Sequence, residues 1–183
     1  MADDILQTFA GLKLPTQAQL DGLRRQGVVP RAMIFDSYDS PVELRRGYVE
    51  WLPNGRFVFE SESTSGVVVD ALIVVGHDQT GDPVDRVASD LRGRFASWHG
   101  LPILGLENAH APRLSDALPV FRHPIQWLAN YRKGVVILDH KKARHYLESA
   151  GAFVVGSTDE GRALSDAMTY RPKIYVNSER HAA

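Results

Sequence analysis

The chain has 183 residues, of which 44% are hydrophobic and 23% are charged, a composition that predicts a folded protein with its own core rather than a disordered chain. It has no cysteine, which excludes a disulfide framework, a thiol nucleophile and a thiolate metal site. No apolar stretch reaches the ~18–20 residues of a membrane-spanning helix. The acidic start, MADDILQTFAGL, lacks the cations of an export signal, so we expect a cytoplasmic protein with no membrane contact.

The net charge of −1 conceals an uneven distribution of charges along the chain. Residues 1–35 carry four cations and three acids (+1), residues 36–90 four and eleven (−7), and residues 91–183 thirteen and eight (+5). The acidic and basic parts can attract each other within the fold or between the subunits of a homo-oligomer. Alternatively, the basic part binds an anionic partner, which would be nucleic acid or an acidic protein.

Residues 1–31 are predicted to form a helical N-terminal segment. A first helix is expected from Asp3 to Gly11. Thr16 and Gln19 have the spacing of a capping box, in which each side chain satisfies a backbone N–H of the other residue. The second helix therefore begins after Thr16, and we expect it to end at Gly27.

Between residues 32 and 98 the hydrophobic pattern changes to a period of two, which predicts an antiparallel β-meander of about five strands. Asn54-Gly55 indicates a tight hairpin turn, because both residues readily adopt a positive φ. The expected strands span residues 48–52, 56–60, 67–75, 84–88 and 94–98.

Residues 99–124 contain four prolines without a clear period, and we interpret them as a connecting stretch on the surface. Between residues 125 and 176 helices and strands alternate, which favours a small parallel sheet. The expected elements are a helix at 125–130, a strand at 134–138, a helix at 139–150, a strand at 152–155, a helix at 158–168 and a strand at 173–176. Residues 177–183 would be a tail. The predicted fold class is a single α+β domain with N-terminal helices, a β-meander and a C-terminal βαβαβ unit.

The segment VVILDHKKARHYL, residues 135–147, carries the densest cluster of cations and imidazoles. Asp139 is predicted to cap the helix that follows the strand. The helical spacing then buries one stripe, made of Ala143, Tyr146, Leu147 and Ala150.

Two interpretations of the remaining side chains stay open. They form a solvated helix face, or they bind an anion together with the hydroxyl residues at the end of the next strand. The anion-binding candidates are Arg132, Lys133, Lys141, Lys142, Arg144, Ser157 and Thr158.

An enzymatic alternative uses the same region, because ligands of open parallel sheets collect outside the carboxyl ends of the strands. In that alternative, Asp139 is a base or metal ligand and Lys141 stabilises charge on a phosphate-bearing substrate. The candidate catalytic residues are Asp139, His140, Lys141 and Ser157.

Three segments have incomplete functional motifs. GSTDEGRA, residues 156–163, has the glycine spacing of a phosphate-binding loop, but Arg162 and Ala163 replace the required Lys and Ser/Thr. Asp36 and Asp39, expected after a short apolar strand, are three residues apart, whereas an aspartate-nucleophile phosphatase needs carboxylates two apart to converge on one magnesium, so we assign them to a turn.

The third segment holds His77, Asp78, Asp82 and Asp85, which match no calcium loop and are interpreted as a polar hairpin tip. We therefore expect neither a metal nor a cofactor.

Three further segments, GDPVDRVA (81–88), HPIQWLANYRKGVVILD (123–139) and DEGRAL (159–164), together resemble a set of uncharacterised bacterial proteins from prophage-like or integrative-element regions. The resemblance covers residues 70–170. It implies a context of mobile DNA and carries no activity.

Charge segregation and the incomplete motifs together favour a non-catalytic binding or accessory protein with a basic C-terminal face. An enzyme acting on a phosphate-bearing substrate and a self-assembling structural protein are the alternatives.

Overall fold

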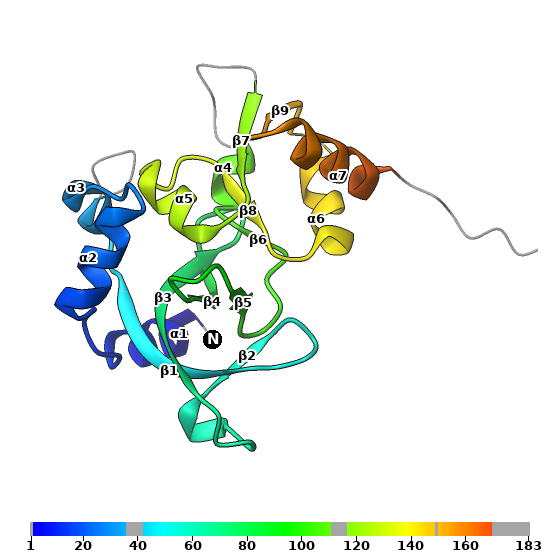
Figure 1. Cartoon of the computed structure of the whole chain (residues 1–183). Helices are drawn as coiled ribbons and strands as arrows, with labels where there is room; N and C mark the ends of the chain where they lie inside the picture. The colour runs from blue at the N-terminus through cyan, green and yellow to red at the C-terminus, as the bar shows by residue number, and fades with distance from the viewer. Residues whose placement is uncertain (1, 36–41, 111–116, 149, 170–183) are drawn as a thin grey trace, which may run out of the picture.

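The computed structural model describes residues 2–35, 42–110, 117–148 and 150–169, which form two β-sheets with helices around them (Figure 1). The predicted α+β class is confirmed: helices lead into an antiparallel sheet, which is followed by a smaller mixed sheet. Within the described ranges, no helix has the length and apolar character needed to cross a bilayer.

The N-terminal helices are α1 (Ala2–Ala10), α2 (Gln17–Arg25) and α3 (Pro30–Ile34). The capping box of α2 is confirmed, since Thr16 Oγ1 accepts from the Gln19 N–H at 3.2 Å and Gln19 Oε1 accepts from the Thr16 N–H at 2.9 Å. The helix α3 corrects the sequence analysis, which placed residues 32–34 in a β region. Pro30 explains the difference, because its fixed φ favours the first turn of a helix.

The first sheet contains β1 (Arg45–Trp51), β2 (Phe57–Phe59), β3 (Val69–His77), β4 (Pro83–Ser89) and β5 (Phe95–Ser97). The predicted hairpin is confirmed, with Trp51 opposite Phe57 and Gly55 at φ +77°. The strand order is β2-β1-β3-β4-β5, so β3 pairs with the far edge of β1 and the sheet is not a strict meander.

The longer connection from β2 to β3 begins with the 3₁₀ turn η1 (Glu60–Glu62). Glu50 holds the residues that follow it, because its Oε2 accepts from Ser63 Oγ at 2.6 Å and from the Thr64 N–H at 3.1 Å. These hydrogen bonds also lower the pKa of Glu50 below its usual value.

The first sheet curls so that its two edge strands approach each other. Arg56, just before β2, forms an isolated bridge with Ser97 of β5. The inner face is filled largely by small and aromatic residues, over which Phe9 of α1 packs. Its buried members include Val49, Phe57, Ala71, Ile73, Ala88 and Ala96.

Two charged neighbours in β4 are buried in different ways. Asp85 is 2% exposed, and its carboxylate accepts from the backbone N–H groups of His99 at 3.0 Å and Leu101 at 2.9 Å. Arg86 is 0% exposed, and its guanidinium lies 3.8 Å from the ring centroid of Trp98 and 5.1 Å from that of Phe59. Its side-chain nitrogens have no hydrogen-bond partner among the described residues, and burial lowers the pKa of Arg86.

The second sheet contains β6 (Ile103–Leu104), β7 (Ala117–Phe121), β8 (Val135–Ile137) and β9 (Ala152–Val154), in the order β6-β8-β7-β9. β7 is parallel to both β8 and β9, and β6 is antiparallel to β8. The interpretation of residues 99–124 as a mere connection was therefore wrong, since they supply β6, the short helix α4 (Glu107–His110) and the central strand β7. Pro119 hid this strand, because proline usually argues against a central position in a sheet.

The helices α5 (Pro124–Ala129), α6 (His140–Leu147) and α7 (Thr158–Met168) follow β7, β8 and β9 respectively. The chain passes from β7 to β8 on one side and then to β9 on the other side of β7. Such a reversal leaves a crevice outside the carboxyl ends of the strands, where ligands of open α/β sheets bind. The strand predicted at 173–176 and the tail at 177–183 lie outside the described residues.

The main core lies between the two sheets and includes Trp127 of α5. A second cluster packs the other face of the small sheet against α6 and α7. Trp127 Nε1 donates to the Gly134 carbonyl at 3.0 Å, and Asn108 Nδ2 donates to the same oxygen at 3.2 Å. These bonds fix the start of β8 and hence the place of its carboxyl end.

We predict that Arg86→Met leaves the free energy of unfolding unchanged or raises it by about 1 kcal/mol or more, because methionine keeps the contact with the two rings and removes a desolvated charge. Arg86→Ala should lower it by about 2–5 kcal/mol by opening a cavity. Chemical denaturation of both variants measures this. A methionine variant as unstable as the alanine variant would show that the charge itself stabilises the fold.

Candidate functional site

The start of α6 confirms the predicted cap. Asp139 Oδ1 accepts from the backbone N–H groups of Lys141 at 3.0 Å and Lys142 at 3.3 Å. Lys142 Nζ lies 3.7 Å from Asp139 Oδ2. The predicted stripe is buried at Ala143, Leu147 and Ala150, whereas Tyr146 is 38% exposed.

The predicted basic face is not one continuous surface. Arg132 is only 8% exposed, and its guanidinium carbon lies 5.8 Å from the ring centroid of Trp127. It has φ +59° in the turn after α5. Arg144 pairs with Glu148 at 3.7 Å.

The exposed cations of the predicted set are Lys133, Lys141 and Lys142. Lys133 precedes β8, whereas Lys141 and Lys142 follow it, so Lys133 lies toward the opposite end of this strand. The two cations at the carboxyl end therefore form the part of the predicted surface that belongs to one place.

Lys141 and Lys142 line a cavity of about 720 Å³ between the β1–β2 turn and the start of α6, which we call the hairpin cavity. Arg56 contributes a third cation from the opposite wall, and Asp139 is the one carboxylate among the lining residues. The other lining residues are Asn54, Gly55, Ser97, Gly100, Leu101, Leu138 and His140.

Arg56 lies in this cavity because of a glycine in the facing loop. Gly100 has φ +94°, and a Cβ added to it would meet Arg56 Nη2 at 2.9 Å. The guanidinium thus rests against bare backbone. Arg56 was not among the site residues predicted from the sequence, because no local pattern distinguishes it and its placement depends on the curl of the first sheet.

Hydrogen bonds join the loop that carries Gly100 to the wall of the hairpin cavity formed by the start of α6. The carboxylate of Asp85 holds the N–H groups of His99 and Leu101, on either side of Gly100. One residue further on, the Pro102 carbonyl accepts from the N–H groups of Leu138 at 2.9 Å and Asp139 at 3.1 Å. The loop that carries Gly100 is therefore connected directly to the start of α6.

A second cavity of about 650 Å³, the switch-point cavity, lies at the carboxyl ends of β7, β8 and β9. β7 and β8 line it directly, Val155 lines it just after the end of β9, and Gly93 and Phe95 line it from the start of β5 and the turn before it. The lining residues from the strands of the second sheet and the segments and helices that follow them are Val120, Phe121, Arg122, Ile137, His140, Val155, Ser157, Asp159, Glu160, Ala163 and Leu164.

The four candidate catalytic residues are divided between these cavities. Asp139 and Lys141 line the hairpin cavity, whereas Ser157 lines the switch-point cavity. His140 lines both. Asp139 and Ser157 therefore do not share a pocket, as a base and a hydroxyl of one catalytic site would.

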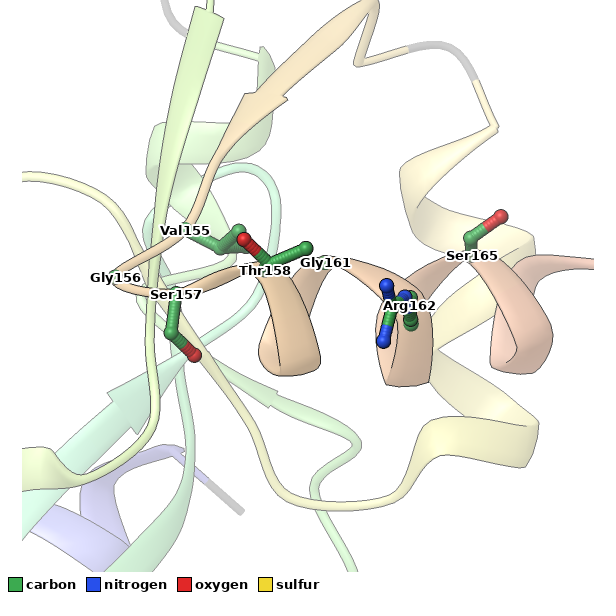
Figure 2. A pocket seen from close by; sticks show the side chains of 7 residues that line it. All are labelled: Val155, Gly156, Ser157, Thr158, Gly161, Arg162 and Ser165. Carbon is green, nitrogen blue, oxygen red and sulfur yellow. The ribbon is translucent and has the colours of Figure 1, made fainter.

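The loop from β9 to α7 satisfies its own backbone. Figure 2 shows the Ser157 side chain pointing away from the side on which Thr158 and Ser165 project. Ser157 Oγ accepts from the Glu160 N–H at 3.2 Å, and Glu160 Oε2 accepts from the Gly156 N–H at 3.0 Å.

A third cavity, of about 630 Å³, lies along the β9–α7 loop and α7 and is lined only by residues 155–158, 161, 162 and 165. Its cation, Arg162, lies 3.5 Å from Asp159. The Gly156 N–H thus already donates to the carboxylate of Glu160, and the carboxylate of Asp159 already pairs with Arg162. These contacts agree with rejecting the segment as a phosphate-binding loop.

In the polar turn between β3 and β4, the carboxylate of Asp78 is hydrogen-bonded within the turn itself. Asp78 Oδ1 accepts from the backbone N–H groups of Thr80 at 2.8 Å and Asp82 at 3.0 Å, and hydrogen bonds from Thr80 are the main cause of its lowered pKa. Asp85 is turned into the core instead. In the part of the chain that the structure describes, no three His, Asp or Glu side chains gather as a metal site, and Asp36 and Asp39 fall outside that part.

His123 follows β7 and begins α5, a role that the sequence analysis missed. Its Nδ1 accepts from the Ile125 N–H at 3.1 Å, and its ring meets that of Phe95 edge to face at 5.2 Å. Burial lowers the pKa of His123, although nearby Asp90 and the Gly93 backbone oppose the shift. The neutral ring is the form that can accept the capping hydrogen bond.

Comparison of the chain with protein-family models, with curated proteins and with solved structures gave no match.

We predict that Asp139→Ala lowers the free energy of unfolding by about 1 kcal/mol through loss of the α6 cap. His145→Ala, at an exposed position of the same helix, is the control and should have little effect. Denaturation curves of both variants measure this, and equal stability of Asp139→Ala and the parent would contradict the cap.

Stability should also fall in weak acid. Burial places the folded-state pKa of both His77 and His123 below the ordinary value of 6.5. Their contribution is complete above the unfolded-state pKa and is lost as the pH falls through the folded-state pKa. His123→Asn keeps a capping acceptor but does not titrate, so its unfolding free energy should decline less below pH ~6.5. If the variant loses as much stability as the parent below this pH, the acid sensitivity comes from groups other than His123.

Proposed function

We propose that this chain is a non-catalytic binding protein that holds the backbone of a nucleic acid in the hairpin cavity. The observation that carries the proposal is the meeting of Arg56, Lys141 and Lys142 around one cavity that contains a single carboxylate. Arg56 lies in the β1–β2 turn of the first sheet, whereas Lys141 and Lys142 lie in α6 after the second sheet, so the three cations converge through the fold and not through sequence spacing alone. Phosphate groups are the common ligands of such a surface.

Binding is favoured over catalysis by the state of Asp139. Its carboxylate accepts two backbone N–H bonds and lies near Lys142, so it already has a structural role. The hydroxyl of Ser157 likewise caps α7. The enzymatic alternative would need these groups in one pocket, and they line different cavities.

The expected cellular location and the sequence resemblance also fit a nucleic-acid partner. A cytoplasmic location would give the protein access to nucleic acid, and the resemblance to proteins of prophage-like regions fits an accessory role on mobile DNA. Self-assembly through the acidic and basic parts of the chain is the other outcome of the same charge segregation. It is less specific, because it does not require the three cations to converge.

The proposal predicts that Lys141→Ala/Lys142→Ala weakens binding to unrelated oligonucleotide sequences by a similar factor, because phosphate contacts carry no base identity. Arg56→Ala should add to the loss. For single strands the slope of log K against log salt should become shallower by about 0.7 for each phosphate contact removed. Fluorescence anisotropy with labelled 20-residue oligonucleotides at low and moderate salt measures both quantities.

The matched control is Arg24→Ala/Arg25→Ala, which removes the same charge from the exposed end of α2. Binding by this control should remain close to that of the parent. Equal losses in the two double variants would mean that only total charge matters, and no binding by the parent at low salt would contradict the proposal.

A further inference from the structure

The switch-point cavity has a different character from the hairpin cavity. Asp159 and Glu160 line it with Arg122 as the one lysine or arginine, and most other lining side chains are apolar. Two carboxylates disfavour a phosphate there, whereas apolar walls suit an uncharged planar group. The two cavities would therefore take different parts of a ligand.

The cavities adjoin at the start of α6. His140 lines both of them, and Lys141 of the hairpin cavity is the next residue along the chain. A ligand whose phosphates contact Lys141 and Lys142 can thus extend past His140 into the switch-point cavity without crossing the core.

Two aromatic side chains line the switch-point cavity. Phe95 and Phe121 both line it, and Phe95 is held edge to face by His123 with an interplanar angle of 89°. The volume of about 650 Å³ lies within the range typical of small-ligand sites. A base can enter only if it is unpaired, because a duplex must first unstack and unpair it.

On these grounds we infer that the partner is single-stranded nucleic acid, with its phosphates in the hairpin cavity and one unpaired base seated in the switch-point cavity. This inference rests on the proposed function, since it assigns the phosphates to the same cations. Single strands are commonly held in this way, by cations along the backbone and aromatic rings against the bases.

The test separates base contacts from phosphate contacts. Binding of a single-stranded 20-residue oligonucleotide is compared with binding of a strand of equal length whose sugars lack bases, and with the duplex. The parent should bind the base-bearing strand about tenfold more tightly than the abasic strand, a factor within the range of base stacking on aromatic side chains. It should also prefer this strand to the duplex.

Ala163→Trp is the informative variant, because Ala163 is exposed on α7 and lines the switch-point cavity, which the larger side chain would fill. It should lose the preference for bases and bind the abasic strand as the parent does. Ser165→Trp is the matched control on the same helix, since Ser165 lines the third cavity instead, and it should keep the preference.

The outcomes distinguish the two proposals. A parent that binds both strands equally, with binding still weakened by Lys141→Ala/Lys142→Ala, overturns the base site and leaves the proposed function standing. Base preference that persists in Ala163→Trp also overturns the base site. Absence of binding to either strand contradicts both proposals.

Discussion

The arrangement of both sheets at the candidate site depends on the hydrogen bonds that the Asp85 carboxylate accepts from the backbone. This carboxylate is almost fully buried and accepts from the backbone at His99 and Leu101, where the chain leaves the first sheet. A buried carboxylate is tolerated when hydrogen bonds satisfy it. Without these bonds, its desolvation would strongly destabilise the folded protein. The loop between the sheets is therefore fixed. Through the Pro102 carbonyl, the same loop holds the start of α6.

This junction explains how charges from distant parts of the sequence meet. Arg56 rests on Gly100 within the fixed loop, while Lys141 and Lys142 follow the cap that Pro102 helps to position. The switch-point cavity, which adjoins at His140, gathers carboxylates and aromatic rings instead. The division suits a ligand with a charged backbone and uncharged planar groups. Nucleic acid is the common polymer of that description.

Sequence reasoning succeeded where a short segment determines its own structure. The capping box at Thr16, the Asn54-Gly55 turn and the helix Thr158–Met168 all depend on side chains within a few residues of one another. It failed where tertiary contacts decide. Pro119 lies in the central strand of the second sheet, and Arg132 is buried against Trp127. The candidate site was half predicted: Lys141 and Lys142 were identified, whereas Arg56 reaches them only through the curl of the first sheet.

The most direct test of the account is to map the amide chemical-shift changes of the protein as a single-stranded oligonucleotide is added. If the hairpin cavity holds the backbone, the amides of Gly55 and Arg56 should shift together with those of His140 to Lys142, while those at the exposed end of α2 stay in place. Shifts confined to α2, or to one wall of the cavity without the other, would contradict the claim that the two sheets form one binding site.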